Sequence, residues 1–335
     1  MNHPPPISSI FRSGTRRQWL ACGGALALLG SASLRAQSKA LASNLHIVIP
    51  ANAGGGWDRT GRALGAALTA SGAVGQVTYE NLGGQGGLLG LQAFAQKHGS
   101  NPDALLIGGT VMVGAVALHR PATDLRHVQP LARLTSEYLT VVVAADSQLL
   151  NAKSLVEALR SRLADMPMAG GSAGGVDHLF AGMLVRAAKA PAEKLVYKPF
   201  ASGPEVVQAV LDKQAAIGIS GYSEMSEALA SGKLRAIGIS SMRSQFGLPS
   251  FHDQGVDADM TNWRGVFTGK QVPAARVQTL TTALQRATQH ESWQRALQEN
   301  RWNPSWVDGK RFADFIALDL STTRVMVDLL KLKAG

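Results

Sequence analysis

Short apolar runs recur along the chain from Leu45 onward, and each is followed by a glycine-containing turn and a segment with helical periodicity. A short continuous apolar run is typical of a buried strand, whereas apolar residues spaced three and four apart indicate an amphipathic helix. The predicted strands, each of which begins one such unit, are residues 45–50, 104–107, 166–169, 195–200 and 215–220. Repeated strand–turn–helix units predict a parallel sheet covered by helices, and therefore an α/β fold.

Two longer apolar segments, 138–144 and 234–240, lack this unit and are predicted to be strands. They bracket the middle of the chain, so we expect them to cross between two α/β lobes and to form a two-strand hinge. After Pro273 the pattern predicts mostly helix, over residues 277–289, 293–299 and 312–331.

Glycine and proline positions support these helix boundaries. Gly72, Gly99 and Gly232 follow amphipathic segments, where a left-handed cap is expected. Pro204 and Pro273 occupy positions where a first helical turn is expected to begin.

The first 36 residues have the pattern of an export signal: a basic stretch around Arg16 and Arg17, an apolar run over 20–30, and small residues up to Ala36. This predicts a signal peptide cleaved after Ala36, and hence a periplasmic protein. The apolar run falls short of the ~20 residues that span a bilayer, which disfavours a membrane anchor. Residues 15–20 also resemble a twin-arginine signal, with an ordinary Sec leader as the alternative.

Composition places the rest of the chain among globular proteins. The 335 residues are 45% hydrophobic and 17% charged, which suits about two domains. Cys22, the only cysteine, lies in the leader, so no disulfide, thiolate nucleophile or cysteine metal ligand is expected beyond it.

The chain outside the leader carries a positive net charge. It contains 29 Lys and Arg and 23 Asp and Glu, which gives a net charge of +6. These charges are scattered, which suits an anionic ligand but not a nucleic acid.

Four turns share one property: each places glycine and free backbone amides at the start of a predicted helix. They are residues 53–58, 108–110, 170–175 and 201–204. A helix N-terminus offers unpaired N–H groups and a partial positive charge, which suits a carboxylate without an arginine clamp. The alternative is that tight turns between strands and helices need glycine in any case. The repetition favours a shared anion site.

Two segments near the start, IPANAGGGWDR (49–59) and ENLGGQGG (80–87), resemble the opening of the Bug-type receptors of tripartite tricarboxylate transporters. GGSAGGVDH (170–178) and YKPFASG (197–203) continue the resemblance in the same order and spacing, over nearly the whole chain after the leader. Within that family, the chain resembles the tricarboxylate-receptor-like branch. One departure is that many members have a proline where this chain has Gly83 and Gly84.

The resemblance implies a type II periplasmic-binding-protein fold that closes on its ligand. Lobe 1 would comprise about residues 42–140 and 242–335, and lobe 2 about residues 141–241. Backbone amides and ordered waters from the first and third glycine loops would hold a ligand carboxylate. Carried over by position, the contacts fall on Gly54, Gly55, Gly56, Trp57, Asp58, Ser172, Gly174 and His178, with Thr110, Ser202 and Tyr222 from neighbouring loops.

Three of these residues allow two interpretations. The Trp57 ring could stack on the ligand or plug the core beneath the loop. Asp58 is unsuited to contact an anion, so we assign it to the amides of its own loop. His178 could donate to a ligand oxygen or be a structural histidine. Replacing Gly55 or Gly174 by a bulky β-branched residue is expected to abolish binding while leaving folding largely intact.

The predicted function is a monomeric solute receptor, without catalytic activity or cofactor, that captures a small carboxylate. Citrate or a related di- or tricarboxylate is favoured by Trp57 and by the family branch. The partner implied by the resemblance is a two-component membrane permease. The alternative within the same class is a receptor that presents its ligand to a sensor kinase.

A serine hydrolase is the competing hypothesis, because Gly170, Ser172 and Gly174 fit the G-x-S-x-G nucleophile elbow. The triad would be completed by His252 or His290 with Asp212 or Asp253. No second oxyanion motif accompanies the elbow, and the resemblance explains the same residues without catalysis.

Nucleotide and metal sites find no support in local motifs. Leu89 occupies the third glycine position of a dinucleotide fingerprint in 84–90, and no phosphate-binding G-x-x-x-x-G-K-[ST] motif occurs. The histidines show neither H-x-H nor H-E-x-x-H spacing, so no metal ligand is predicted.

Overall fold

The computed structural model describes Met1 and residues 42–332. The predicted signal peptide and its twin-arginine motif lie outside the described residues. No helix within the described residues is both long enough and apolar enough to cross a membrane.

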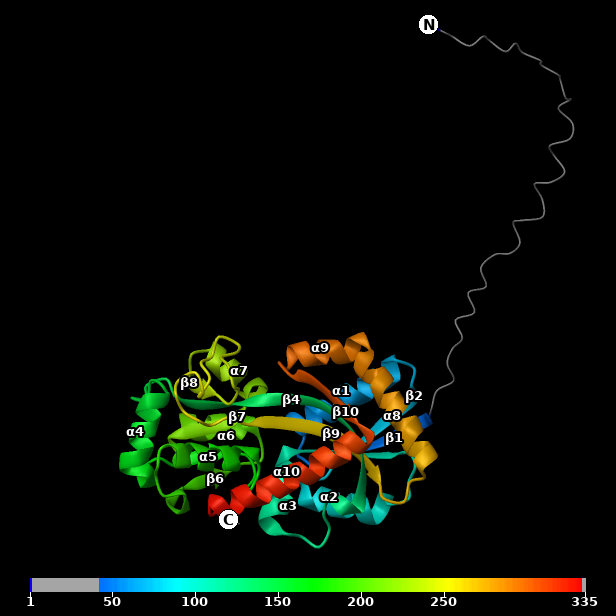
Figure 1. Ribbon diagram of the computed structural model, residues 1–335, viewed down its shortest axis with the longest axis horizontal. Coiled ribbons are helices and arrows are strands. Elements are labelled where there is room, and N and C mark those ends of the chain that lie inside the picture. Colours follow the sequence, from blue (N-terminus) through cyan, green and yellow to red (C-terminus); the bar gives the residue numbers. More distant parts are fainter. Residues whose placement is uncertain (2–41, 333–335) are drawn as a thin grey trace, which may run out of the picture. The chain divides into compact units, whose positions relative to one another are not determined.

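Strands and helices alternate along most of the chain (Figure 1). The strands are β1 (Ala42–Ile49), β2 (Val74–Asn81), β3 (Ala104–Gly109), β4 (Val128–Ala144), β5 (Met168–Gly170), β6 (Tyr197–Pro199), β7 (Ile217–Gly221), β8 (Leu234–Ile239), β9 (Thr261–Gly269) and β10 (Asn303–Asp308). The α-helices are α1 (Gly56–Ala70), α2 (Leu88–His98), α3 (Thr110–His119), α4 (Ala152–Arg162), α5 (Val176–Ala187), α6 (Gly203–Leu211), α7 (Tyr222–Ala230), α8 (Ala274–Gln289), α9 (Glu291–Glu299) and α10 (Gly309–Leu329).

The sheet is parallel towards both ends and antiparallel in the middle. Its order is β2-β1-β3-β9-β4-β7-β5-β6, with β8 and β10 also paired to β4. β2, β1 and β3 run parallel, as do β7, β5 and β6, whereas β9 and β4 run antiparallel to their neighbours. The predicted α/β class is therefore present, but the expectation of a purely parallel sheet was wrong at its centre.

Strand β4 joins the two parallel parts. Up to Tyr138, which pairs with Thr261, its partners are β9 and β10. From Leu139, which pairs with Gly221, its partners are β7 and β8. Figure 1 shows β4 and β9 running through the middle of the fold, between the region of β1 and α8 and the region of α4 and β8. The predicted strand 138–144 is the second half of β4, and the predicted strand 234–240 is β8.

Two main hydrophobic cores lie on either side of this change of partners. One contains β1 and β3 together with Trp293 and Phe312 from the C-terminal helices, and the other contains Phe180 and Phe251. All six residues of β3 are buried, as expected for a continuous apolar strand covered on both faces.

The helix boundaries follow the sequence signals with one exception. Gly72 and Gly232 have φ of 67° and 71°, the left-handed conformation predicted for helix caps. Gly99 has φ of −55°, so its predicted left-handed cap was wrong. Pro204 lies in the first turn of α6, and Pro273 directly precedes α8.

Candidate functional site

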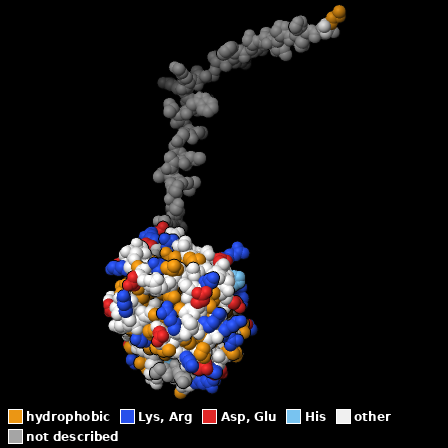
Figure 2. Space-filling model, turned by 90° about the vertical axis from the view of Figure 1, so that its left-hand side faces the viewer, with side chains coloured by type: hydrophobic (Ala, Val, Ile, Leu, Met, Phe, Trp, Pro, Cys, Tyr) orange, Lys and Arg blue, Asp and Glu red, His pale blue; other side chains and the backbone are white. Residues whose placement is uncertain are grey.

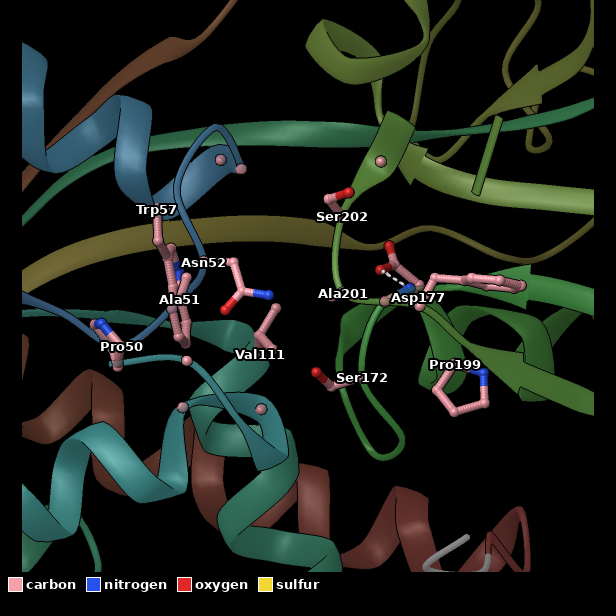
Figure 3. Close-up of a pocket in the computed structure, with 18 of the residues that line it drawn as sticks. Pro50, Ala51, Asn52, Trp57, Val111, Ser172, Asp177, Pro199, Ala201 and Ser202 are labelled. Atoms are coloured by element: carbon pink, nitrogen blue, oxygen red, sulfur yellow. Dashed lines mark hydrogen bonds between the residues drawn. The ribbon is translucent and has the colours of Figure 1, made fainter. Parts of the chain in front are cut away.

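A cavity of about 560 Å³ lies among loops that lead from strands into helices. Figure 3 shows two walls that face each other, with Asn52 and Trp57 on one side and Ser172, Asp177 and Ser202 on the other. Its lining residues are Pro50, Ala51, Asn52, Gly55, Gly56, Trp57, Gly83, Gly84, Gln85, Gly86, Gly87, Val111, His119, Gly171, Ser172, Ala173, Asp177, Pro199, Phe200, Ala201, Ser202, Gly203, Ser220, Gly221, Glu224, Asn262 and Arg264.

Helix starts supply part of both walls. Gly55 precedes α1, Ser202 precedes α6 and Gly221 precedes α7, and no side chain caps any of these three helices. The first N–H groups of a helix lack intrahelical partners and carry a partial positive charge. The cavity therefore offers hydrogen-bond donors to an anion, as the glycine loops predicted.

Several loop amides are already bonded by the protein's own carboxylates. Gly54 N donates to Asp58 Oδ2 at 2.9 Å, and Gly171 N donates to Asp177 Oδ2 at 2.9 Å. The role predicted for Asp58, bonding the amides of its own loop, is thus observed. Arg62 and Asn81 also donate to Asp58, and these bonds hold the pKa of its carboxyl below its usual value against the opposing effect of burial.

A buried ion pair forms the floor of the cavity. Arg264 lines the cavity from β9, and its Nη2 donates to Glu137 Oε1 of β4. Asn262 Nδ2 and Ser223 Oγ also donate to Glu137, at 3.3 and 3.1 Å. The Arg264 guanidinium carbon lies 5.0 Å from the centre of the Trp302 ring. Arg264 was not among the predicted site residues.

The floor also contains buried polar atoms without partners among the described residues. These atoms are Nε and Nη1 of Arg264 and Oδ1 of Asn262. Buried polar groups are normally hydrogen-bonded, so these atoms are exceptions within the described residues. Nothing in the glycine motifs pointed to Arg264 or Glu137. The available signal is that each is a charged residue within a strand-like segment, and that the two charges are opposite.

Glycines next to the floor make room for these charged side chains. A Cβ at Gly56 would collide with the Arg264 guanidinium, and a Cβ at Gly221 would collide with the Glu137 carboxylate. Gly55 differs, because a Cβ there would have only Asn52 O nearby, at 3.8 Å. The glycines at positions 56 and 221 are therefore explained by the room that Arg264 and Glu137 need. The glycine at position 55 is better explained by the close approach of a ligand to the backbone.

Carboxyl groups make the cavity wall more acidic than predicted. Asp177 and Glu224 line it, and Ser220 Oγ donates to Glu224 Oε2 at 2.7 Å. Burial raises the pKa of Asp177 to about 7, against the lowering effect of the Gly171 N–H bond. Asp177 is therefore close to half-protonated at neutral pH.

A family model described as "Tripartite tricarboxylate transporter family receptor" matches residues 63–332. The chain belongs to this family. The family predicted from the loop motifs is confirmed, and so is the prediction that the chain is a binding protein rather than an enzyme. Among curated proteins, none matches this receptor in sequence.

Solved structures show the fold of the receptor. The periplasmic binding protein BugD superimposes with a TM-score of 0.78 at 19% identity, over 87% of this chain and 98% of its own. MatC from Rhodopseudomonas palustris, with bound malate, gives 0.74 at 19% identity, over 85% and 99%. An R. palustris protein with adipate gives 0.77 at 14% identity, over 87% and 98%. The predicted periplasmic-binding-protein fold, with two α/β lobes, is thereby confirmed.

The structure brings five of the eleven predicted site residues of the receptor to the cavity wall: Gly55, Gly56, Trp57, Ser172 and Ser202. The other six do not line it: Gly54, Asp58, Thr110, Gly174, His178 and Tyr222.

Three of these six have contacts elsewhere. Thr110 Oγ1 accepts from Trp263 N at 2.9 Å, which ties α3 to β9. The Tyr222 ring stacks on Phe246, with the ring centres 4.7 Å apart. Gly174 has φ of 77°, and a Cβ there would collide with Leu118, so a β-branched residue would disturb folding. The expectation that a substitution at Gly174 leaves folding intact was wrong.

His178 has the contacts of a structural histidine. Its Nδ1 accepts from Gly174 N at 3.0 Å, and its ring stacks on Tyr197 with the ring centres 4.1 Å apart. Burial lowers the pKa of His178 to about 4, so the ring is neutral at pH 7. Its bond to Gly174 shapes the third loop behind the cavity wall.

Among the described residues, no hydrogen bond joins Ser172 to a histidine, as a hydrolase triad would require. Ser172 Oγ has no hydrogen-bond partner among the described residues. His290 Nδ1 accepts from Ser292 N at the start of α9, and Asp253 accepts from Ser244. The receptor therefore presents Ser172 as a cavity-lining hydroxyl without a general base.

Proposed function

We propose that this receptor captures a small carboxylate in the 560 Å³ cavity. The observation that carries the proposal is the uncapped start of α1, where Gly55, Gly56 and Trp57 line the wall. Helix N-termini bind carboxylates through free amides and the helix dipole. The volume lies within the range of roughly 300–1,000 Å³ that is usual for small-molecule sites.

The ligand class proposed is citrate or a related di- or tricarboxylate. MatC was solved with bound malate and the second R. palustris protein with adipate, and both ligands are dicarboxylates. These structures support a ligand with at least two acidic groups. One carboxylate would bind at α1, and a second would lie towards Arg264, which lines the cavity. Hydroxyl groups would be bonded by Ser172 and Ser202, which line the opposite wall.

Closure of two lobes would bury this ligand. Lobe 1 is proposed to comprise about residues 42–140 and 242–335, and lobe 2 about residues 141–241. The change of partners along β4, between Tyr138 and Leu139, supports a boundary there. Ligand binding would favour the closed form, and a membrane permease would recognise that form. We place this monomeric receptor in the periplasm, after removal of the leader near Ala36.

A thermal-shift screen of residues 37–335 against organic acids, amino acids and aromatic carboxylates tests the proposal. A ligand at 100 times its Kd stabilises the folded state by ~2.7 kcal/mol, so binding of a carboxylate should clearly raise the Tm. A rise limited to di- and tricarboxylates would support the ligand class. No rise with any acid, together with covalent labelling of Ser172 by a fluorophosphonate, would support the hydrolase instead.

A further inference from the structure

Three potential metal ligands meet on the part of the fold that carries one cavity wall. His46 in β1, Glu80 in β2 and His98 at the end of α2 each offer one ligand atom, and these atoms lie within 4.8 Å of one another. All three side chains are partly exposed. No short motif marks the group, because its members lie on three elements and only the fold brings them together.

The hydrogen bonds of His46 leave one ring nitrogen facing a carboxylate. His46 Nδ1 lies 2.9 Å from Thr78 Oγ1, which accepts from the ring when Nδ1 carries the proton and donates to it when Nε2 carries the proton. With the proton on Nδ1, His46 Nε2 carries a lone pair, and this lone pair faces Glu80 Oε2 at 3.4 Å. With the proton on Nε2 instead, the same contact is a hydrogen bond to Glu80, so the pair can hold either a proton or a metal ion.

The third ligand is held in place by its neighbours. The His98 and His46 rings have centres 5.4 Å apart, and Phe94 packs against the other side of His98 at 5.4 Å. The Asn101 side-chain amide lies 3.3 Å from His98 Nδ1 and orients the ring. In this arrangement His98 Nδ1 accepts from Asn101 Nδ2, so the neutral ring carries its proton on Nε2, and metal binding has to displace that proton or the Asn101 contact.

We propose that His46, Glu80 and His98 form a Zn²⁺ site with a fourth position open to water. Two imidazoles and one carboxylate suit Zn²⁺, whereas Mg²⁺ and Ca²⁺ prefer oxygen ligands. Ligand atoms at about 2.1 Å from a tetrahedral ion lie roughly 3.4 Å apart, which matches the separation of His46 Nε2 and Glu80 Oε2. His98 supplies the third ligand atom, which lies within 4.8 Å of the other two.

A bound ion would cross-link three elements that lead into the cavity wall. β1 runs into the loop that begins at Pro50, β2 precedes Gly83, and α2 begins directly after Gly87. Zn²⁺ binding is therefore expected to raise the thermal stability of this part of the fold without contacting the carboxylate ligand.

The test is calorimetric titration of Zn²⁺ into purified protein that carries no polyhistidine tag. One ion per chain is expected, and Glu80→Gln and His98→Gln should each weaken binding by at least about tenfold. His252→Gln is the matched control, because His252 is an exposed histidine on another loop. Unchanged Zn²⁺ affinity in both ligand variants would overturn the proposal. So would an absence of Zn²⁺ binding.

A second readout does not depend on the variants. Co²⁺ bound at the site of the wild-type protein should show the intense visible absorption of a four-coordinate ion with nitrogen and oxygen ligands, and Zn²⁺ should abolish it by displacing Co²⁺. Only the weak absorption of hydrated, octahedral Co²⁺ would contradict the site.

Discussion

Arg264 and Glu137 form an ion pair beneath the ligand cavity, with only 2% and 1% of their side chains exposed. Burial raises the pKa of Glu137, and the Arg264 guanidinium opposes that rise. Two buried charges are expensive to desolvate, and each depends on the other for compensation. The pair also joins β4 to β9, next to the point where β4 changes partners. This relationship links the stability of the fold to the charge of the cavity floor.

Breaking this pair should destabilise the protein strongly. We expect Glu137→Gln or Arg264→Met to lower the free energy of unfolding by about 3–5 kcal/mol, because each leaves a buried charge without its partner. The double variant should recover part of this loss. Urea denaturation at pH 7 measures all three values.

Lys310→Met provides the control for this prediction, because the Lys310–Asp314 pair has side chains that are 85% and 62% exposed. An exposed ion pair contributes at most about 1 kcal/mol to the free energy of unfolding. If Arg264→Met were no more destabilising than Lys310→Met, the pair would not have the role assigned to it.

Affinity for a carboxylate should depend on the ionisation of Asp177. The pKa of this carboxyl is raised to about 7, so it is mostly neutral below pH 7 and negatively charged above it. Anion affinity should therefore fall as the pH rises through about 7, by up to about tenfold per unit. Calorimetry with a dicarboxylate that is fully ionised from pH 6 to 8 isolates the contribution of the protein.

Asp177→Asn should remove this pH dependence, whereas Asp146→Asn, at an exposed carboxyl, should preserve it. The same shift predicts that Asp177 makes the folded state less stable as the pH rises from about 4 to 7, because the unfolded chain ionises first. A dicarboxylate affinity that is constant from pH 6 to 8 in the wild type would contradict the assignment.

Trp57 should contribute to the core as well as to the cavity wall. It is 7% exposed and belongs to the larger hydrophobic core, and Gly87, which has no side chain, leaves space for its ring. We expect Trp57→Ala to cost about 3–5 kcal/mol of unfolding free energy, and Trp57→Phe to cost clearly less. Trp306→Ala, at a half-buried indole, should cost less than Trp57→Ala. Equal losses for the two alanine variants would refute a core role for Trp57.

Burial alone does not decide which strands were predicted, because β6 was predicted although two of its three residues are exposed, and β9 was missed although only its first residue is exposed. The run ALLIGG of β3 is buried at every position, so its apolar pattern was unambiguous. β2 has the sequence VGQVTYEN and is half or fully exposed at most positions, which leaves no continuous apolar signal. In β9, Arg264 interrupts the apolar run, because its partner Glu137 lies on another strand. Only the tertiary fold explains a charge in that position.

The candidate site was predictable where it depends on backbone turns. Gly55 and Ser202 precede uncapped helices at the cavity, as the glycine loops indicated. Position in a motif could not show which neighbouring residues face away, so His178 was grouped with the cavity although it bonds Gly174 behind the wall. The charged floor was missed because Arg264 and Glu137 are 127 residues apart in the sequence.

The direct test of the central claim, carboxylate capture at the start of α1, is calorimetric titration of the best carboxylate into the wild type and Gly55→Val. Gly55 has φ of −79° and ψ of 176°, which valine can adopt, and a Cβ there would have only Asn52 O nearby, at 3.8 Å. The account predicts an unchanged Tm and at least about a tenfold loss of affinity, or ~1.4 kcal/mol, because the side chain blocks the amides. Ala53→Val, on an exposed residue of the same loop, should retain affinity. Wild-type affinity in a folded Gly55→Val variant would contradict the account.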